Sequence, residues 1–402
     1  MKMIAPLWAF CLVLLAFMVV SLAEPSRLSA ESYAAAGSRH DQAWGPIALQ
    51  GDFATAIVMD AVTGEILGAK KPHEQRQPAS MVKMMTELLI LEEINKGNIS
   101  LSDVVTVSAQ ASRMGGSQAY LKQGECFTVE SLLMALAIHS ANDAAVALAE
   151  YHSGSTAAFV RRMNRRAQEL GMRTTVFRFV HGLPPSWKQK PDLTTAYDMA
   201  LLGCEVVKHP KALQWASTRM APFRAGKFTL YNSNSLIDKY PGLDGLKTGY
   251  HYRAGFCMTA TAVRDGRRLV TVVMGAPNPG TRGAETARLL DFGFSCYTHL
   301  RLPETEGQPL AHGFPVKGGK SRNVTVACAE PLTVSVLKDR ADEVILELVL
   351  EEGSSDKLPA PVKAGQVVGK AVAVLSGRAL GEVPIIAVES VAKGSFLDQL
   401  WH

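Results

Sequence analysis

One apolar stretch, from Val129 to about His152, constrains the fold more than any other part of the chain. Its aliphatic residues occupy nearly every face of a helix, and a helix of this kind lies at the centre of a domain. Polar residues at 139–143 interrupt it. Buried polar groups need partners, so this break indicates either a site inside the core or the cap of a second helix that begins at Asp143.

A second feature is the stretch Pro78–Lys83, which places a serine hydroxyl and a lysine amine three residues apart where an apolar helix begins. Residues i and i+3 share a helix face, so Ser80 and Lys83 project together. A lysine can activate a serine when burial or a second cation lowers its pKa. Alone the pattern is weak, because a serine beside a lysine also fits an ordinary helix cap.

Strand patterns flank the helices of the first 300 residues. Two hairpins are expected, one from Thr55–Asp60 and Glu65–Ala69, the other from Phe256–Val263 and Arg268–Ala276 through Asp265-Gly266. A closing helix follows at about 284–294. Strands paired from the two ends of such a unit, with helices between, predict an α+β fold in which an antiparallel sheet is faced by helices.

Around Leu302 the pattern changes to short strands and turns, which predicts a second, small all-β C-terminal domain of sandwich or barrel type. Because 402 residues exceed one typical domain, four parts are expected. These are a signal peptide (1–23), a spacer (24–50), a catalytic domain (51–300) and the β-rich domain (301–402).

The first 23 residues carry Lys2, an apolar run and Ser21-Leu22-Ala23, which predicts an exported protein, in the periplasm or on the outer face of the cytoplasmic membrane. An uncleaved membrane anchor stays open. A hydrophobic content of 47% and a charged content of 20% fit a packed globular protein. The formal net charge is only +5 and no basic run interleaves with aromatic residues, so no nucleic-acid partner is expected.

The cysteines indicate neither a dense disulfide framework nor a zinc site. Of six, Cys11 lies in the leader and the other five are not closely spaced; one bridge stays open, and most are expected to be buried small hydrophobes. The segment 313–321 imitates a phosphate loop, but its spacing is wrong and no helix follows. No cofactor and no metal are therefore expected.

Three motifs stand in chain order: Ser80-x-x-Lys83, Ser140-Ala141-Asn142 and Lys247-Thr248-Gly249. Together they resemble the active-site signature of the penicillin-binding proteins and serine β-lactamases. Further segments, among them His181-Gly182-Leu183 and Gly275-Ala276-Pro277, make residues 52–295 look like the low-molecular-mass D-alanyl-D-alanine carboxypeptidases. Residues 364–369 and 381–384 resemble the β-rich C-terminal domain of that family.

The resemblance implies roles in acyl transfer. Ser80 would attack the carbonyl of the penultimate D-alanine, Lys83 would take its proton, and Ser140 would relay protons to the leaving amine. Asn142 would hold the substrate backbone and Lys83. The oxyanion would lie between the backbone N–H groups of Ser80 and Tyr250.

It also implies a carboxylate-binding end of the site. Lys247 would keep Lys83 partly neutral and attract the substrate's terminal carboxylate, and Thr248 would hydrogen-bond that group. Gly249 would let the peptide backbone approach closely. Arg282 is a further candidate for the carboxylate.

The expected partners are peptidoglycan stem peptides and, as covalent inhibitors, β-lactam antibiotics. Membrane-surface contact through the segment Phe396–His402 is open, although seven residues are too few for an interfacial helix. One departure from the family pattern is Phe179, where an asparagine is usual, and it draws attention to the loop before His181-Gly182.

The expected activity is that of a serine-type D-Ala-D-Ala carboxypeptidase. The alternatives are a peptidoglycan DD-endopeptidase, a β-lactamase, and a non-catalytic wall-binding protein. No Glu-x-x-x-Asn pattern lies between Asn142 and Lys247 to position a hydrolytic water in the way that class A β-lactamases do.

Overall fold

The computed structural model describes residues 46–184, 186–187, 189–305, 307–310, 313–350 and 357–395. The expected signal peptide, most of the expected spacer, and the segment 396–402 lie outside the described residues. The spacer prediction is wrong at its end, because Ile47–Ala48 forms strand β1 and pairs in parallel with β3.

A six-stranded sheet forms the centre of the first unit. Its order is β1-β3-β2-β10-β9-β8, with every neighbouring pair except β1 and β3 antiparallel. The predicted first-to-last pairing is confirmed by β2 against β10. The bounds are β2 (Thr55–Asp60), β3 (Ile66–Lys70), β8 (Leu243–His251), β9 (Gly255–Arg264) and β10 (Arg267–Ala276).

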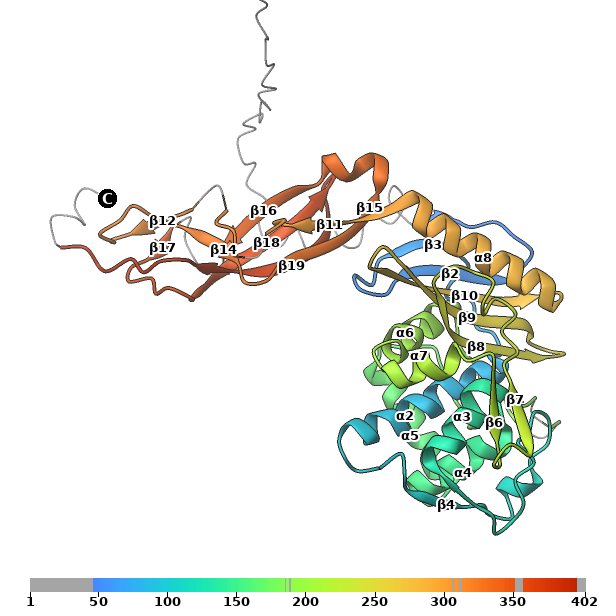
Figure 1. Cartoon of the computed structure of the whole chain (residues 1–402). Helices are drawn as coiled ribbons and strands as arrows, with labels where there is room; N and C mark the ends of the chain where they lie inside the picture. The colour runs from blue at the N-terminus through green and yellow to red at the C-terminus, as the bar shows by residue number, and fades with distance from the viewer. Residues whose placement is uncertain are drawn as a thin grey trace, which may run out of the picture. The chain divides into compact units, whose positions relative to one another are not determined.

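Both faces of this sheet are buried, because successive strand residues point to opposite sides. In β2, Ile57 and Met59 join the core cluster on the helical side, whereas Ala56 and Val58 join the cluster under α8 (Pro279–Cys296). Figure 1 shows the sheet between α8 and the other helices. The predicted antiparallel sheet faced by helices is confirmed.

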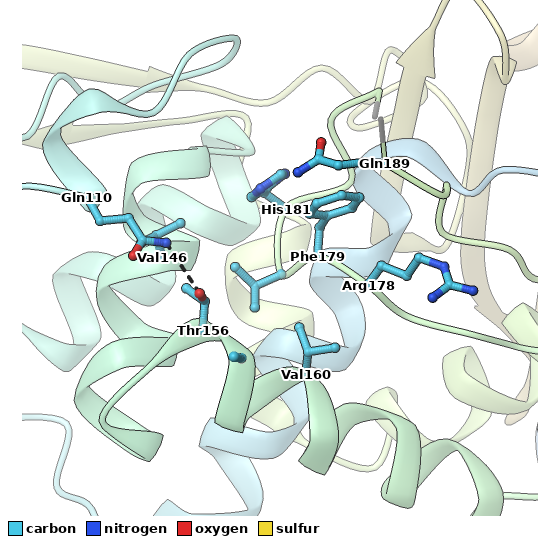
Figure 2. A pocket seen from close by; sticks show the side chains of 10 residues that line it. Gln110, Val146, Thr156, Val160, Arg178, Phe179, His181 and Gln189 are labelled. Atoms are coloured by element: carbon cyan, nitrogen blue, oxygen red, sulfur yellow. Dashed lines mark hydrogen bonds between the residues drawn. The ribbon is translucent and has the colours of Figure 1, made fainter. Parts of the chain in front are cut away.

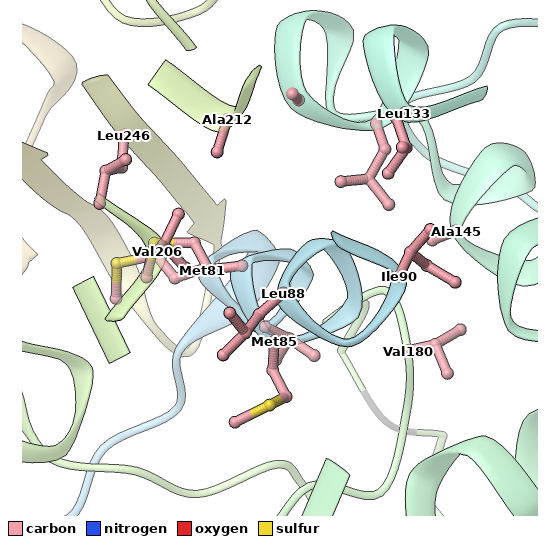
Figure 3. Close-up of a cluster of buried hydrophobic side chains, with 14 of the residues drawn as sticks. Met81, Met85, Leu88, Ile90, Leu133, Ala145, Val180, Val206, Ala212 and Leu246 are labelled. Carbon is pink, nitrogen blue, oxygen red and sulfur yellow. The ribbon is translucent and has the colours of Figure 1, made fainter. Parts of the chain in front are cut away.

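The helix that carries the Ser-x-x-Lys pattern is buried within the helical side. Short helix η1 (Ala79–Val82) runs directly into α2 (Lys83–Asn95), whose residues up to Leu91 are all buried. Figure 3 shows α2 between Leu133 and Ala145 on one side and Val206 and Leu246 on the other. The surrounding helices are α3 (Val129–His139), α4 (Asn142–Ser153), α5 (Thr156–Glu169), α6 (Ala196–Val206), α7 (Pro210–Ala216) and the short η2 (Ala111–Arg113).

Two small antiparallel strand pairs complete this unit: β4 (Val104–Thr106) with β5 (Cys126–Thr128), and the hairpin of β6 (Met220–Phe223) with β7 (Phe228–Tyr231). No sequence pattern predicts α7, β6 or β7. None of these three elements exceeds seven residues, which is too short for periodicity to be decisive.

The C-terminal part is all-β, as predicted, apart from one short helix, η3 (Lys338–Glu343). Strand β11 (Tyr297–Leu302) crosses the expected boundary at residue 300 and pairs with β15 (Leu332–Leu337). The other strands are β12 (Phe314–Lys317), β13 (Asn323–Val324), β14 (Val326–Cys328), β16 (Ile345–Leu350), β17 (Leu358–Pro359), β18 (Val367–Leu375) and β19 (Arg378–Ala387).

The five cysteines of the described chain are all free thiols. Cys257 and Cys328 are buried, Cys126 is exposed, and the other two are half-buried, so the expectation that most are buried is wrong. Among the described residues, no helix is long and apolar enough to cross a membrane, and no cluster of His, Cys, Asp and Glu has the arrangement of a metal site.

Candidate active site

The nucleophile candidate lies in a tight turn rather than in the first turn of an α-helix. Ser80 is the second residue of η1, and Lys83 is the first residue of α2. Side chains three residues apart eclipse in a 3₁₀ turn, and Lys83 Nζ lies 3.1 Å from Ser80 Oγ. Ala79, just before the serine, has a left-handed φ of 50°, a strained conformation that is typical of functional turns.

Lys83 is fully buried, and its amine also donates a 2.7 Å hydrogen bond to the carbonyl oxygen of His181. Burial holds the pKa of Lys83 well below its usual 10.5, and the charge of Lys247 lowers it further. Asp143 and Asp192 oppose this shift. Because its pKa is lowered, the Lys83 amine loses its proton at a lower pH than the amine of an exposed lysine does. The neutral amine can then accept a proton from Ser80.

The loop that supplies the His181 carbonyl is fixed from two sides. Thr86 of α2 donates a 2.9 Å hydrogen bond to the Val180 carbonyl, and the buried Asp192 carboxylate accepts the backbone N–H groups of residues 178 and 179. A Cβ on Gly182, whose φ is +73°, would lie 2.0 Å from the carbonyl oxygen of Ala79, so only glycine fits there. The loop is therefore locked against the nucleophile turn.

Phe179 packs on the histidine that follows it. The rings of Phe179 and His181 are stacked with centroids 5.4 Å apart, and burial together with Lys83 lowers the pKa of His181 to about 3. Both side chains line a cavity of about 340 Å³, together with Arg178 and Gln189 (Figure 2). The phenylalanine thus shapes the loop whose His181 carbonyl accepts the hydrogen bond from Lys83.

The polar break in the apolar stretch is a turn between two helices. Ser140 has a left-handed φ of 62° after α3, and a second helix does begin here, at Asn142 rather than the expected Asp143. Ala141 precedes it without a side-chain cap, so the predicted polar cap is wrong. The buried Asp143 carboxylate accepts the backbone N–H groups of Ala119 and Leu121. The charge of this carboxylate also raises the pKa of Lys83, against the larger effect of burial.

Asn142 does not hold Lys83 as expected. Its side-chain amide donates a 2.7 Å hydrogen bond to the carbonyl oxygen of Gly115, and its own N–H donates to Ser117. Within the described chain, its Oδ1 atom is buried without a hydrogen-bond partner. Asn142 therefore fixes the 115–117 loop and keeps one free acceptor.

Strand β8 contributes the third motif. Lys247 is buried and donates to the neighbouring Thr248 carbonyl, while burial lowers the pKa of Lys247 to about 7. Thr248 Oγ1 lies 2.5 Å from Ser233 Oγ, and Arg282 Nη2 donates to the Ser233 carbonyl at 3.3 Å. Ser233 thus joins two of the predicted carboxylate ligands. Sequence reasoning missed it, because no motif surrounds it.

Gly249 brings β8 close to the nucleophile turn. A Cβ there would lie 3.1 Å from the Ser80 backbone nitrogen and 2.8 Å from the carbonyl oxygen of Pro78. Strand β8 is the last in the sheet order, and in the described part of the chain no further strand pairs with its outer edge, which is the edge that an extended peptide would join. Tyr250 follows, with its ring stacked on Phe256 and 55% exposed.

Taken together, the site combines a serine beside a buried amine, further cationic and hydroxyl groups, and an open strand edge. Ser80 and Lys83 are joined directly, and Thr248 is joined to Arg282 through Ser233. Ser140 lies in the neighbouring turn, with no hydrogen bond from its hydroxyl within the described chain. This arrangement can perform acyl transfer on an extended peptide that ends in a carboxylate.

Comparison with known proteins agrees with this chemistry. The family model described as D-alanyl-D-alanine carboxypeptidase matches residues 45–278, and one described as the C-terminal domain of penicillin-binding protein 5 matches residues 306–393. The chain is similar to D-alanyl-D-alanine carboxypeptidase DacF of Bacillus subtilis, with 38% identity over 86% of this chain and 87% of the relative.

Solved structures give the same result. Penicillin-binding protein 5 from Haemophilus influenzae is 30% identical, with a TM-score of 0.75 over 86% of this chain and 99% of that one. Penicillin-binding protein D2 from Listeria monocytogenes, in an ampicillin-bound form, is 31% identical, with a TM-score of 0.56 over 61% of this chain and 98% of that one.

Proposed function

Because the chain belongs to the D-alanyl-D-alanine carboxypeptidase family, we propose that it removes the terminal D-alanine of peptidoglycan pentapeptides through an acyl-enzyme on Ser80. It is a serine-type carboxypeptidase of the penicillin-binding group. The observation that carries the proposed mechanism is the 3.1 Å contact between Ser80 Oγ and the fully buried amine of Lys83.

In the acylation step, Lys83 accepts the proton of Ser80 as the serine oxygen forms a bond to the carbonyl carbon of the penultimate D-alanine. The oxyanion is held by the backbone N–H groups of Ser80 and Tyr250, and each such donor contributes about 3 to 4 kcal/mol in comparable enzymes. When the peptide bond breaks, the leaving D-alanine takes a proton, which Ser140 relays. The close approach of Gly249 to the Ser80 nitrogen supports this geometry.

The terminal carboxylate is bound at the other end of the site. Thr248 hydrogen-bonds it, and Lys247 and Arg282 supply positive charge. The contacts that join Thr248 and Arg282 through Ser233 support this role, because they hold the threonine hydroxyl at a fixed place on β8.

In the second step, water attacks the acyl-enzyme, and Lys83 again accepts and returns the proton. Asn142 holds the substrate backbone through its free Oδ1 acceptor. The loop at 179–182 sets the position of Lys83 through the His181 carbonyl, so Phe179 affects the rate of this hydrolysis.

β-Lactams are covalent inhibitors that acylate the same serine. A related structure holds ampicillin, which supports this proposal. We also propose the division into a leader (1–23), a spacer, a catalytic domain (about 51–300) and a β-rich domain (about 301–402), with export to the periplasm or the outer face of the cytoplasmic membrane. The match of a separate family model to residues 306–393 supports the last domain.

The test is release of D-alanine from a purified muropeptide that carries a pentapeptide stem. The wild-type chain and a control with the exposed Ser102 changed to alanine should release it, whereas Ser80→Ala should not. Release by Ser80→Ala at the wild-type rate would refute the assignment. Conversion of crosslinked dimers to monomers instead would identify a DD-endopeptidase.

A further inference from the structure

The hydroxyl of Ser233 lies against Thr248, the residue proposed to hydrogen-bond the terminal carboxylate of the substrate. Ser233 Oγ and Thr248 Oγ1 are 2.5 Å apart, which is a short hydrogen bond between two hydroxyl groups. Among the described residues, neither hydroxyl has a second hydrogen-bond partner. Thr248 is only 6% exposed, whereas Ser233 is exposed. Before a substrate arrives, Ser233 is therefore the protein group that orients the threonine hydroxyl.

Each hydroxyl carries a single hydrogen, and this limits how the pair can share its donors. A hydroxyl donates one hydrogen bond and accepts up to two, whereas an ionised carboxylate only accepts. If Thr248 donates to Ser233, it has no hydrogen left for the substrate. If Ser233 donates to Thr248, the threonine O–H is free to donate to the carboxylate, and a hydrogen bond to an ionised group is a strong one. The second arrangement is the one that fits the proposed role of Thr248.

The backbone around Ser233 is held from both sides, which keeps its hydroxyl next to β8. The carbonyl oxygen of Ser233 accepts a 3.3 Å hydrogen bond from Arg282 of α8. The side-chain amide of Asn232 donates to two main-chain carbonyl oxygens at the end of α7. Asn234 is 1% exposed, and its N–H donates to Asn232 Oδ1 at 3.0 Å. These contacts fix the segment and leave the hydroxyl of Ser233 to hydrogen-bond Thr248.

The same segment is tied to the turn that carries Ser140. The Tyr231 N–H group donates a 3.1 Å hydrogen bond to Nδ1 of His139, which directly precedes Ser140. Residues 231–233 therefore connect the turn that is proposed to relay the proton with the hydroxyl that is proposed to bind the carboxylate. In the proposed mechanism, both groups act on the leaving D-alanine, so this segment borders the place of that residue.

We propose that Ser233 is a positioning residue of the carboxylate-binding end: its hydroxyl donates to Thr248 Oγ1 and so leaves the Thr248 O–H to donate to the substrate's terminal carboxylate. The inference rests on the function proposed above and adds a residue outside its three motifs. Ser233 acts through Thr248, and no covalent bond forms or breaks at its own oxygen.

Ser233→Ala tests the inference, because it removes the hydroxyl at an exposed position. For an acetylated Lys-D-Ala-D-Ala tripeptide, kcat/KM should fall about fivefold, mainly through KM, because Thr248 loses the donor that orients it. Ser233→Thr restores a hydroxyl and should stay within about twofold of wild type. The matched control is Ser235→Ala. The Ser235 hydroxyl lies beside Gly283 and makes no hydrogen bond within the described chain, so the kinetics of this variant should overlay those of wild type.

A double-mutant cycle separates action through Thr248 from direct binding of the carboxylate. With Thr248→Val in place, Ser233→Ala should change kcat/KM by no more than about twofold, because no threonine hydroxyl is left to orient. A further loss of about fivefold in that background would show that Ser233 acts independently of Thr248, and it would overturn the proposal. An equal loss from Ser233→Ala on the same tripeptide with an amidated C-terminus would overturn it as well.

Failure of this inference can be told apart from failure of the proposed function. After treatment with benzylpenicillin, wild type and Ser233→Ala should each gain the mass of one penicillin, and Ser80→Ala should gain none. If wild type gains none, the proposed function fails. If wild type is acylated and folded Ser233→Ala keeps the wild-type kcat/KM, the role of Ser233 alone is refuted. If Ser233→Ala does not fold, Ser233→Cys, whose thiol is a weaker donor, must show a loss in KM of the same direction. An unchanged KM in Ser233→Cys then refutes the proposal.

Discussion

Replacing Gly249 with alanine tests whether the close approach of β8 to the nucleophile turn is required for acylation. The added Cβ would lie 2.8 Å from the carbonyl oxygen of Pro78, where ordinary contact begins at 3.4 Å. The obstacles include the backbone of η1, which cannot rotate away as a side chain can. The turn must therefore move by about 0.6 Å, the difference between these two distances.

That movement displaces both the Ser80 hydroxyl and the Ser80 N–H group that is proposed to bind the oxyanion. A misplacement of about 1 Å costs an enzyme about 10²-fold, so a shift of this size should cost roughly 10- to 100-fold, or about 1.4 to 2.7 kcal/mol. The assay is the second-order rate of labelling by a fluorescent penicillin. Thermal unfolding of the same samples checks that the fold is retained.

Gly381→Ala is the matched control, because Gly381 is also a strand glycine with a negative or extended φ, in β19. Its added Cβ would meet only the ends of the Leu332 and Val334 side chains. The control should label at the wild-type rate. If folded Gly249→Ala also labels within about threefold of wild type, the turn does not need this approach and the reasoning fails.

Two further changes probe the carboxylate end and the loop. Thr248→Val removes the hydroxyl that lies 2.5 Å from Ser233 Oγ, and kcat/KM for the peptide should fall roughly 10- to 100-fold, mainly through KM. An equal loss on the same peptide with an amidated C-terminus would contradict carboxylate binding. Burial raises the pKa of Asp192 from 3.8 to about 6, so its contribution to stability falls as pH rises through that window. The free energy of unfolding of Asp192→Asn, relative to that of wild type, should therefore rise by about 3 kcal/mol when the pH is raised from about 4 to about 7. Urea unfolding at the two pH values measures this difference, and no relative rise would refute the reasoning.

Much of the fold follows from local patterns. The hairpin of β9 and β10 was predicted because Asp265 and Gly266 can both adopt positive φ, and in the structure both do. The boundary at residue 300 was less accurate, because β11 finds its partner β15 about thirty residues later. Pairing across such a separation leaves no signature in the local sequence.

The site shows the same limit. Ser80, Lys83, Thr248 and Gly249 follow from the motifs, since short motifs fix short-range geometry. The hydrogen bond from Lys83 to the His181 carbonyl spans 98 positions and involves a main-chain atom, so no side-chain pattern indicates it. Tertiary packing also buries Glu87, an acidic residue that no motif singles out.

The central claim is that Ser80 forms the acyl-enzyme, and the intact mass of the protein before and after benzylpenicillin tests it most directly. The wild-type chain should gain the mass of one penicillin, and Ser80→Ala, with the same thermal stability, should gain none. The mass before treatment also reports whether the leader is removed. An adduct that persists on Ser80→Ala, or a folded wild-type chain that takes up no penicillin, would contradict the account.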